Sequence, residues 1–301
     1  MCTEPGGSPH LFDVLPTGLR HEMNSDPEIE TGNFAPQSGK FMARAPFRLI
    51  DWNIDRGLKL SGVIEFLESA KADLILLQEV DINAKRTHQL NVACEIAKRL
   101  RMNYVFGREF QELTQGSDQS PAYHGQATLS PWPLSNQRII HFQKQSQFWR
   151  PRWFLPNVEP FQERIGGRIA LVSMVDLGGR RLLNYNLHLE SRGDDTIRLA
   201  QLNECLYDVR RSRTNADTVM AGDFNLNVFR SSAAREIVGA GFVSTAAKDP
   251  VRTTPPHSLF ERGRAIDWIF TRGSVRPAKV CVHNSVSASD HFPLSVNLDL
   301  T

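Results

Sequence analysis

The chain has little cysteine, no long apolar run and no excess of one charge. Its four cysteines, Cys2, Cys94, Cys205 and Cys281, are scattered over 301 residues. This spacing argues against a cysteine-based metal motif and a dense disulfide scaffold, and it favours a reducing compartment. No apolar run approaches the roughly 20 residues that span a bilayer, and the N-terminus lacks the basic-then-apolar pattern of a signal peptide. We therefore expect a cytoplasmic protein without a transmembrane segment.

The formal net charge of +2 is too small to indicate a nucleic-acid partner from bulk electrostatics. Any recognition of phosphate must therefore be local. What the chain does have is the composition of an ordinary soluble globular protein, with 41% hydrophobic and 23% charged residues. Its length is sufficient to bury a sizeable core.

The sequence divides into a tail and a dense folded region. Residues 1–46 are rich in Gly, Pro, Ser and Asn, with turn-forming clusters at short intervals and no helical or strand period. We predict a disordered or loosely draped tail there. Residues 47–301 form the predicted domain, in which strand and helix patterns alternate.

Strand and helix patterns in the domain indicate an α/β fold. Gly178 and Gly179 join two strand patterns directly, as in a hairpin. Hairpins mixed with crossover connections favour packed mixed sheets flanked by helices over a doubly wound parallel sheet. We expect helices over residues 61–71 and 195–213, and one capped by Thr87 that buries residues up to Leu100. The expected strands are residues 47–54, 73–77, 104–106, 127–130, 169–176, 181–188, 217–221, 265–271, 279–283 and 294–298.

A carboxylate and a carboxamide emerge where one buried strand ends. Asp223 and Asn225 follow the apolar residues 218–221, and alternation turns both to the same side of the chain, away from Phe224. Two such groups aimed at one point suit a metal-bound water and a phosphate oxygen. The pair therefore indicates chemistry.

Polar residues also end two earlier strands. Asn53 closes the first, and Glu79 closes the second, directly after four apolar residues. A glutamate in that place needs a partner or a cation. Magnesium prefers carboxylate and other oxygen ligands, so Glu79 beside an Asn53 amide fits a Mg²⁺ site. The alternative is a pair of strand-end residues that face solvent.

Two histidines and two further acids complete the candidates. His188 ends an alternating strand and can donate to a phosphoryl oxygen, or serve only as a structural hydrogen-bonder. Asp267 lies inside an apolar strand and needs a partner, for which His291 is suitable. The alternative for Asp267 is a structural salt bridge. Asp290 either fixes its loop or holds the metal.

These residues lie in six short stretches whose order covers nearly all of residues 47–301. In this respect the chain resembles the endonuclease/exonuclease/phosphatase superfamily of metal-dependent phosphodiesterases, which have a DNase I-like fold. The resemblance implies a four-layer α/β/β/α sandwich, with Mg²⁺ or Mn²⁺ at Glu79 and Asn53 nearby. The matching stretches are residues 51–54, 77–80, 186–188, 222–225, 266–269 and 289–291.

The same resemblance implies roles for the remaining residues. Asp223 would orient or deprotonate the attacking water, and Asn225 would hold a phosphate oxygen. His188 and His291 would stabilise the charge on the phosphoryl group. Asp267 would orient His291.

Two features outside these stretches bear on the substrate. The family often has a Gly-Asn-Ala-type stretch where this chain has Gln126, whose longer carboxamide is a candidate phosphate contact. Residues 148–154 combine four aromatic rings with Arg150 and Arg152, which can clamp phosphate and stack on bases. The same composition suits a phospholipid head group, or a hydrophobic plug over the sheet with its arginines reaching solvent.

Three functions are consistent with these observations. The first is a hydrolase of phosphodiester or phosphomonoester bonds with nucleic acid as its substrate. The second is a phospholipid or sphingolipid phosphodiesterase with the same chemistry. The third is a catalytically silent binding protein. The complete set of site residues argues against the third, because loss of activity should have removed Glu79, Asp223 or His291.

Overall fold

The computed structural model describes residues 28–36, 46–156, 158, 161, 163–212, 216–245, 251–256, 262–278 and 280–299. Most of the predicted tail therefore lies outside the described residues. One part of it does not. Strand β1 (Ile29–Asn33) pairs antiparallel with β4 (Asn103–Glu112), and Glu30 accepts a hydrogen bond from Asn91 Nδ2 at 2.6 Å. The expectation that residues 1–46 contain no strand is wrong for β1. This segment has no alternation of apolar and polar residues, and it forms a strand because it pairs with the edge strand β4.

The described strands form two mixed sheets. The first sheet has the order β1-β4-β5-β3-β2-β15-β13, with β14 on β15 and β7 on β4. The second sheet has the order β11-β12-β10-β9-β8-β6. The other strands of the first sheet are β2 (Phe47–Arg56), β3 (Leu74–Ile82), β5 (Ala122–Ser130), β7 (Arg164–Gly166), β13 (Arg276–Pro277), β14 (Cys281–Val282) and β15 (Leu294–Asp299). Those of the second are β6 (Leu134–His141), β8 (Ile169–Asp176), β9 (Arg181–His188), β10 (Asp217–Asp223), β11 (Val243–Ser244) and β12 (Asp267–Arg272).

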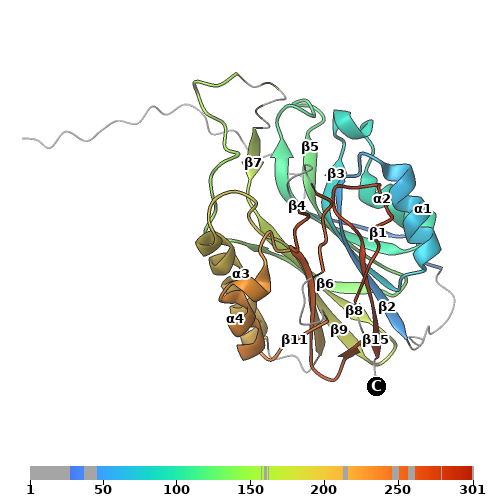
Figure 1. Cartoon of the computed structure of the whole chain (residues 1–301). Helices are drawn as coiled ribbons and strands as arrows, with labels where there is room; N and C mark the ends of the chain where they lie inside the picture. The colour runs from blue at the N-terminus through green and yellow to red at the C-terminus, as the bar shows by residue number, and fades with distance from the viewer. Residues whose placement is uncertain are drawn as a thin grey trace, which may run out of the picture.

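Helices cover the outer face of each sheet, so the molecule has four layers (Figure 1). α1 (Leu60–Ala70) and α2 (Val92–Leu100) pack on the first sheet. α3 (Asp195–Arg211) and α4 (Ala233–Gly239) pack on the second. The α/β/β/α sandwich expected from the sequence is confirmed.

Alternation along each strand separates three hydrophobic cores. In β2, Ile50 and Trp52 face α1 and α2, whereas Phe47 and Leu49 face the other sheet. Ala221 of β10 faces back from the second sheet into the same layer. We call the side of each strand that faces the other sheet its inter-sheet face. The site residues prove to lie on this face.

The structure confirms some local predictions and differs from others. The hairpin at Gly178 is confirmed, because β8 and β9 pair antiparallel up to Asp176 and Arg181. The predicted cap of α2 by Thr87 is wrong: Asn91 is the cap, and its side chain accepts from Cys94 N at 3.0 Å. Thr87 instead ends a 3₁₀ turn, Lys85–Thr87. Strands β6, β7, β11 and β13 and helix α4 had not been expected.

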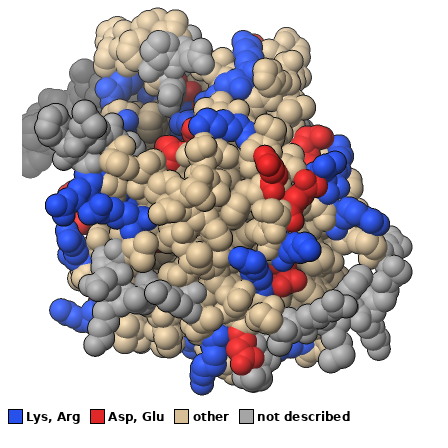
Figure 2. All heavy atoms as spheres, turned by 45° about the vertical axis from the view of Figure 1, so that its right-hand side comes forward, with Lys and Arg blue, Asp and Glu red and all other residues tan. Residues whose placement is uncertain are grey.

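The surface carries charges of both signs. On the face in Figure 2, several basic and acidic side chains lie beside one another. Among the described residues, no helix combines the length and the apolar character that crossing a membrane demands.

Candidate active site

The register of three neighbouring strands places three predicted site residues side by side. β9 and β10 are parallel, with His188 opposite Asp223. β12 is antiparallel to β10, with Asp267 also opposite Asp223. Because Ala221 lies on the inter-sheet face and the side-chain period of a strand is two, Asp223 lies on that face too. The three side chains therefore meet at one end of the second sheet, between the sheets.

The first sheet supplies Asn53 to the same point. β2 and β3 are parallel, so the polar residues that end them lie at one edge. Asn53 Nδ2 donates to Asp223 Oδ2 at 3.3 Å, across the gap between the sheets. The Ser289 hydroxyl donates to Asn53 O at 2.7 Å, and Trp52 Nε1 donates to His291 O at 2.9 Å. These bonds fix the 289–291 loop over the end of β2.

His291 lies between two carboxylates. Its Nδ1 lies 2.9 Å from Asp267 Oδ1, and its Nε2 lies 3.7 Å from Asp223 Oδ2. Burial alone would lower the pKa of His291, but the charges of Asp267 and Asp223 raise it to about 10. A pKa of about 10 keeps the imidazole protonated at neutral pH, and its contact with Asp267 is the pairing suggested by the sequence.

Asp223 is a buried carboxyl group at the centre of the set. Burial and the nearby charge of Asp267 raise its pKa, although its oxygens have polar neighbours. Its Oδ1 accepts from Asn225 N at 2.8 Å, and its Oδ2 lies 3.8 Å from His188 Nε2. Asn225 has a left-handed φ of 49° and donates its side-chain amide to Leu189 O at 3.1 Å. This backbone turn brings Asn225 beside Asp223.

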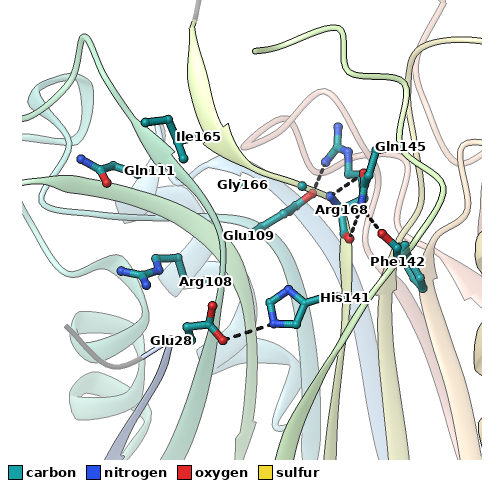
Figure 3. A pocket seen from close by; sticks show the side chains of 11 residues that line it. Glu28, Arg108, Glu109, Gln111, His141, Phe142, Gln145, Ile165, Gly166 and Arg168 are labelled. Atoms are coloured by element: carbon teal, nitrogen blue, oxygen red, sulfur yellow. Dashed lines mark hydrogen bonds and ion pairs between the residues drawn. The ribbon is translucent and has the colours of Figure 1, made fainter. Parts of the chain in front are cut away.

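His188 is packed against a buried ion pair that the sequence did not predict. Arg168 Nη1 lies 2.6 Å from Glu109 Oε1 and 2.8 Å from His188 Nδ1. Glu109 Oε2 lies 3.4 Å from the same histidine nitrogen. Figure 3 shows the Arg168–Glu109 pair at one wall of a cavity of about 290 Å³. Only the fold brings β4, β8 and β9 together, so spacing along the chain gave no indication of Glu109.

Replacing Glu109 with glutamine should destabilise the protein by about 3 kcal/mol at neutral pH, because it leaves the buried Arg168 without its carboxylate. Burial alone would raise the pKa of Glu109, but Arg168 and His188 lower it to about 2 from an ordinary 4.5. A carboxyl group whose pKa is depressed on folding stabilises the native state above its unfolded pKa, and that stabilisation is lost as pH falls. The difference in unfolding free energy between wild type and variant should therefore narrow between about pH 4.5 and pH 2. Denaturant titrations at a series of pH values measure this difference.

Glu95→Gln is the matched control, because Glu95 forms an exposed ion pair with Lys98 on α2. Such surface pairs contribute about 0.5 kcal/mol or less. If Glu109→Gln and Glu95→Gln lowered the free energy of unfolding equally, the buried ion pair would contribute no more to stability than the exposed one.

A β-bulge turns Glu79 into the site. In β3, Leu77 faces the helices and Gln78 has the opposite orientation, so strict alternation would turn Glu79 outward. The register shifts between Leu77 and Val80, and Glu79 has a left-handed φ of 51°. Its Oε1 then lies 3.8 Å from His188 Nε2. Bulges commonly re-aim a side chain in this way beside active sites.

The oxygen donors around Glu79 fit a hard divalent cation. Burial and the charges of Asp290 and, to a smaller extent, Glu79 raise the pKa of Asp55, although Arg56 opposes them. Three carboxylates therefore act on one another at the mouth of the site. Asn53 adds a carboxamide oxygen, which accepts from Asp55 N at 3.1 Å. Carboxylate and amide oxygens with room for water suit Mg²⁺ or Mn²⁺.

A second group of ligand atoms fits a cation less well. Single atoms of Glu79, His124 and His188 lie within 4.8 Å of one another. The Nδ1 of His124 is engaged at 2.9 Å by Asp81, however, and His188 lies against the guanidinium of Arg168. A fixed positive charge at that point opposes a metal ion. The oxygen set also has a guanidinium beside it, because Arg56 pairs with Asp55 and lies 3.6 Å from Glu79 Oε2. The oxygen set is the better match because all its donors are oxygens, which Mg²⁺ prefers.

A protein-family model agrees with this geometry. The model, described as the Endonuclease/Exonuclease/phosphatase family, matches residues 52–291. The matched range contains every residue of the site described above. The chain belongs to this family. Its members are generally hydrolytic phosphoesterases.

Solved structures share the fold at low sequence identity. An endonuclease/exonuclease/phosphatase from Beutenbergia cavernae has 16% identity and a TM-score of 0.60, covering 85% of this chain and 72% of that one. TDP2 from D. rerio, complexed with a single-strand DNA product, has 17% identity and a TM-score of 0.59, covering 85% and 100%. SmcL has 14% identity and a TM-score of 0.62, covering 85% and 99%. No curated protein matches the sequence.

Three residues suggested as substrate contacts do not join the family site. Gln126 is fully buried, its Nε2 donating to Ile169 O at 3.0 Å and its Oε1 accepting from Leu171 N at 3.1 Å. Both ends of its amide therefore join the two sheets, which corrects the expectation of a phosphate contact. Arg150 and Arg152 are exposed, and their hydrogen bonds to other described residues involve only their backbone.

A buried acid beneath the site had no role in the sequence interpretation. Asp51 is fully buried, and burial, with the charge of Asp267, raises its pKa well above the ordinary value. Gln78 Nε2 donates to Asp51 Oδ1 at 2.9 Å and to Asn186 Oδ1 at 2.8 Å. This polar layer between the sheets supports the strand ends that carry Asn53 and His188. Alternation placed Asp51 on the correct face, but its partners come from other strands.

Proposed function

We propose that this protein is a divalent-metal-dependent hydrolase of phosphodiester bonds, with nucleic acid as its substrate. The observation that carries the proposal is the convergence on Asp223 Oδ2. Asn53 Nδ2 lies 3.3 Å away, His291 Nε2 3.7 Å and His188 Nε2 3.8 Å. A carboxylate ringed by donors at the ends of both sheets is suited to an attacking water and a phosphoryl group.

The residues divide the reaction between them. Asp223 accepts a proton from the attacking water, which adds to phosphorus as the bond to the leaving oxygen breaks. His291, protonated and held by Asp267 at 2.9 Å, donates to a phosphoryl oxygen as charge builds there. His188 donates from the second side. Asn225 uses one amide hydrogen on Leu189 O, and its other hydrogen is directed to a phosphate oxygen.

Glu79 and Asn53, with Asp290 beside them, would hold the cation. A bound Mg²⁺ or Mn²⁺ would neutralise negative charge on the phosphate group. The left-handed backbone at Glu79 keeps the carboxylate in place beforehand. Preorganisation of this kind removes the cost of reorienting the ligand during the reaction.

Aromatic and basic side chains beside the site support a nucleic-acid substrate. Trp153 is 97% exposed, and the guanidinium of Arg192 stacks on Phe148 at 4.6 Å and on Trp149 at 5.3 Å. Exposed rings next to arginines provide stacking surfaces for bases and contacts for phosphates. The TDP2 structure of the same fold contains a single-strand DNA product.

A substrate panel tests the proposal. With Mg²⁺ present, the protein should hydrolyse bis-p-nitrophenyl phosphate slowly and cut DNA or RNA oligonucleotides much faster, as measured by release of p-nitrophenol and by gel. Sphingomyelin and phosphoinositides are the comparison substrates. Rapid cleavage of a phospholipid, with no cleavage of DNA or RNA, would show that the substrate is a lipid and not a nucleic acid. If the protein hydrolyses none of these diesters, the proposed phosphodiesterase activity is refuted.

A further inference from the structure

A cavity of about 710 Å³ adjoins the proposed catalytic centre on the second sheet. It begins at Asn225 and Ile266, the residue before Asp267, and extends away from the site towards the start of α3. Its outer lining is basic. The exposed arginines that line it are Arg230, Arg252, Arg262 and Arg264.

The backbone that carries two of these arginines is bonded to the catalytic strands. Thr253 N donates to Arg264 O at 2.7 Å, which ties the segments of Arg252 and Arg264 together. The buried Thr253 hydroxyl accepts from Asp267 N at 3.2 Å. Phe292 N, next to His291, donates to Thr253 O at 2.7 Å. The cavity wall is therefore fixed relative to Asp267 and His291.

The acids near the cavity are already neutralised. Asp195 accepts from Arg198 Nη1 at 2.9 Å, and the same guanidinium bonds the backbone oxygens of Glu190 and Ser191. Arg198 is thus a structural residue whose charge neutralises that of Asp195, the acidic residue of the lining. Within the described part of the chain, no ion pair joins the four exposed arginines to a carboxylate. Among the described residues, the lining of the cavity therefore has a net positive charge, which suits an anionic ligand.

The geometry points to a second phosphate subsite in this cavity, which binds a backbone phosphate of a nucleic-acid strand a short distance from the bond that is cut. This inference rests on the proposed function, because it names how the substrate of that centre is held. Guanidinium groups offer the planar donors that phosphate oxygens accept. A strand with one charge per nucleotide can place one phosphate beside Asn225 and another among the arginines.

The lining favours a nucleic-acid strand over a lipid. Its larger apolar members, Leu226 and Ile266, are 3% and 4% exposed, so the cavity offers no apolar surface to an acyl chain. A lipid head group would meet the arginines but leave its chains unsupported. A strand presents repeated phosphates and needs no such surface.

The double substitution Arg252→Gln and Arg264→Gln tests the subsite. We expect kcat/KM for a single-stranded 12-mer to fall about tenfold relative to that for bis-p-nitrophenyl phosphate, which has one phosphate. Binding of the labelled 12-mer, followed by fluorescence anisotropy, should weaken by a similar factor. The slope of log Kd against log salt should become shallower by about 1.4, or 0.7 for each lost contact. Arg210→Gln is the control, since Arg210 is an exposed arginine at the opposite end of α3.

The outcomes separate the subsite from the proposed function. The subsite would be overturned if the double variant kept the wild-type ratio of kcat/KM values, affinity for the 12-mer and salt slope. It would also be overturned if Arg210→Gln reduced these quantities as much as the double variant does. Arginine-dependent binding of the 12-mer without cleavage of any diester would keep the subsite and refute the hydrolase. Arginine-dependent binding of anionic phospholipid vesicles, with no effect on the 12-mer, would overturn the subsite in favour of a lipid head group.

Discussion

Replacing Asp223 with asparagine is expected to lower kcat for phosphodiester hydrolysis by about a thousandfold or more, with little change in KM. Loss of a general base costs about this much, and the amide cannot accept the proton of the attacking water. The shape of the side chain is retained, so Asn53, His188 and His291 keep their positions. Steady-state kinetics on an oligonucleotide and on bis-p-nitrophenyl phosphate measure the effect.

The same substitution should leave the fold at least as stable as wild type. Burial and Asp267 raise the pKa of Asp223. For an acid, a pKa raised on folding means that the ionised form destabilises the native state once pH exceeds the unfolded pKa. An uncharged amide removes that penalty at neutral pH. A variant that loses activity while the protein becomes more stable is the expected result for a carboxylate that is kept for function rather than for stability.

Asp217→Asn is the matched control, because Asp217 begins the same strand β10. It accepts from Arg180 Nη2 at 2.7 Å and from Ser274 N at 2.6 Å, and these bonds lower its pKa. This substitution should reduce the melting temperature and spare kcat. A variant at Asp223 that keeps more than a tenth of wild-type kcat would exclude Asp223 as the base.

The sequence was informative wherever one strand determined the answer. Alternation alone placed Asp51 and Asn53 on the face opposite Trp52, and the structure has them between the sheets. Parallel strands then bring their polar ends to one edge, which is why His188 and Asp223 meet. The fold class follows from such patterns because they repeat along the chain and need no knowledge of distant partners. The family was indicated separately, by the resemblance of six short stretches to its members.

The sequence failed where a partner lay on another strand or the backbone broke its period. Glu109 and Arg168 are 59 residues apart and meet only through the sheets. Glu79 reaches the site through a bulge with positive φ, which alternation cannot predict. Gln126 stands where the family often has an asparagine, and its amide forms hydrogen bonds to β8 that link the two sheets. Long-range pairing, rather than residue type, decided these roles.

Chelation of the metal is expected to reduce diester hydrolysis about a thousandfold, and excess Mg²⁺ or Mn²⁺ should restore it. The physical reason is the cluster of Asp55, Glu79 and Asp290. Burial and the charge of Asp290 raise the pKa of Asp55, against the opposing charge of Arg56 and with a smaller contribution from Glu79, and a bound cation would stabilise these carboxylates in their ionised form. A divalent metal ion stabilises the charge in such a transition state by several kcal/mol. Initial rates measured after EDTA treatment and stepwise addition of metal give the dependence.

Glu79→Gln should then require about 10- to 100-fold more Mg²⁺ for half-maximal rate, since it removes one charged ligand but keeps an oxygen donor. Glu68→Gln is the control, because Glu68 forms an exposed pair with Arg99 on the outside of the molecule. A rate insensitive to EDTA, or an unchanged metal requirement in Glu79→Gln, would exclude a metal at Glu79. If His124→Asn shifted the requirement as strongly, the cation would lie instead in the group of Glu79, His124 and His188, on the side of Arg168. The oxygen set predicts that His124→Asn leaves the requirement as it is, because His124 is bound to Asp81 and takes no part in that set.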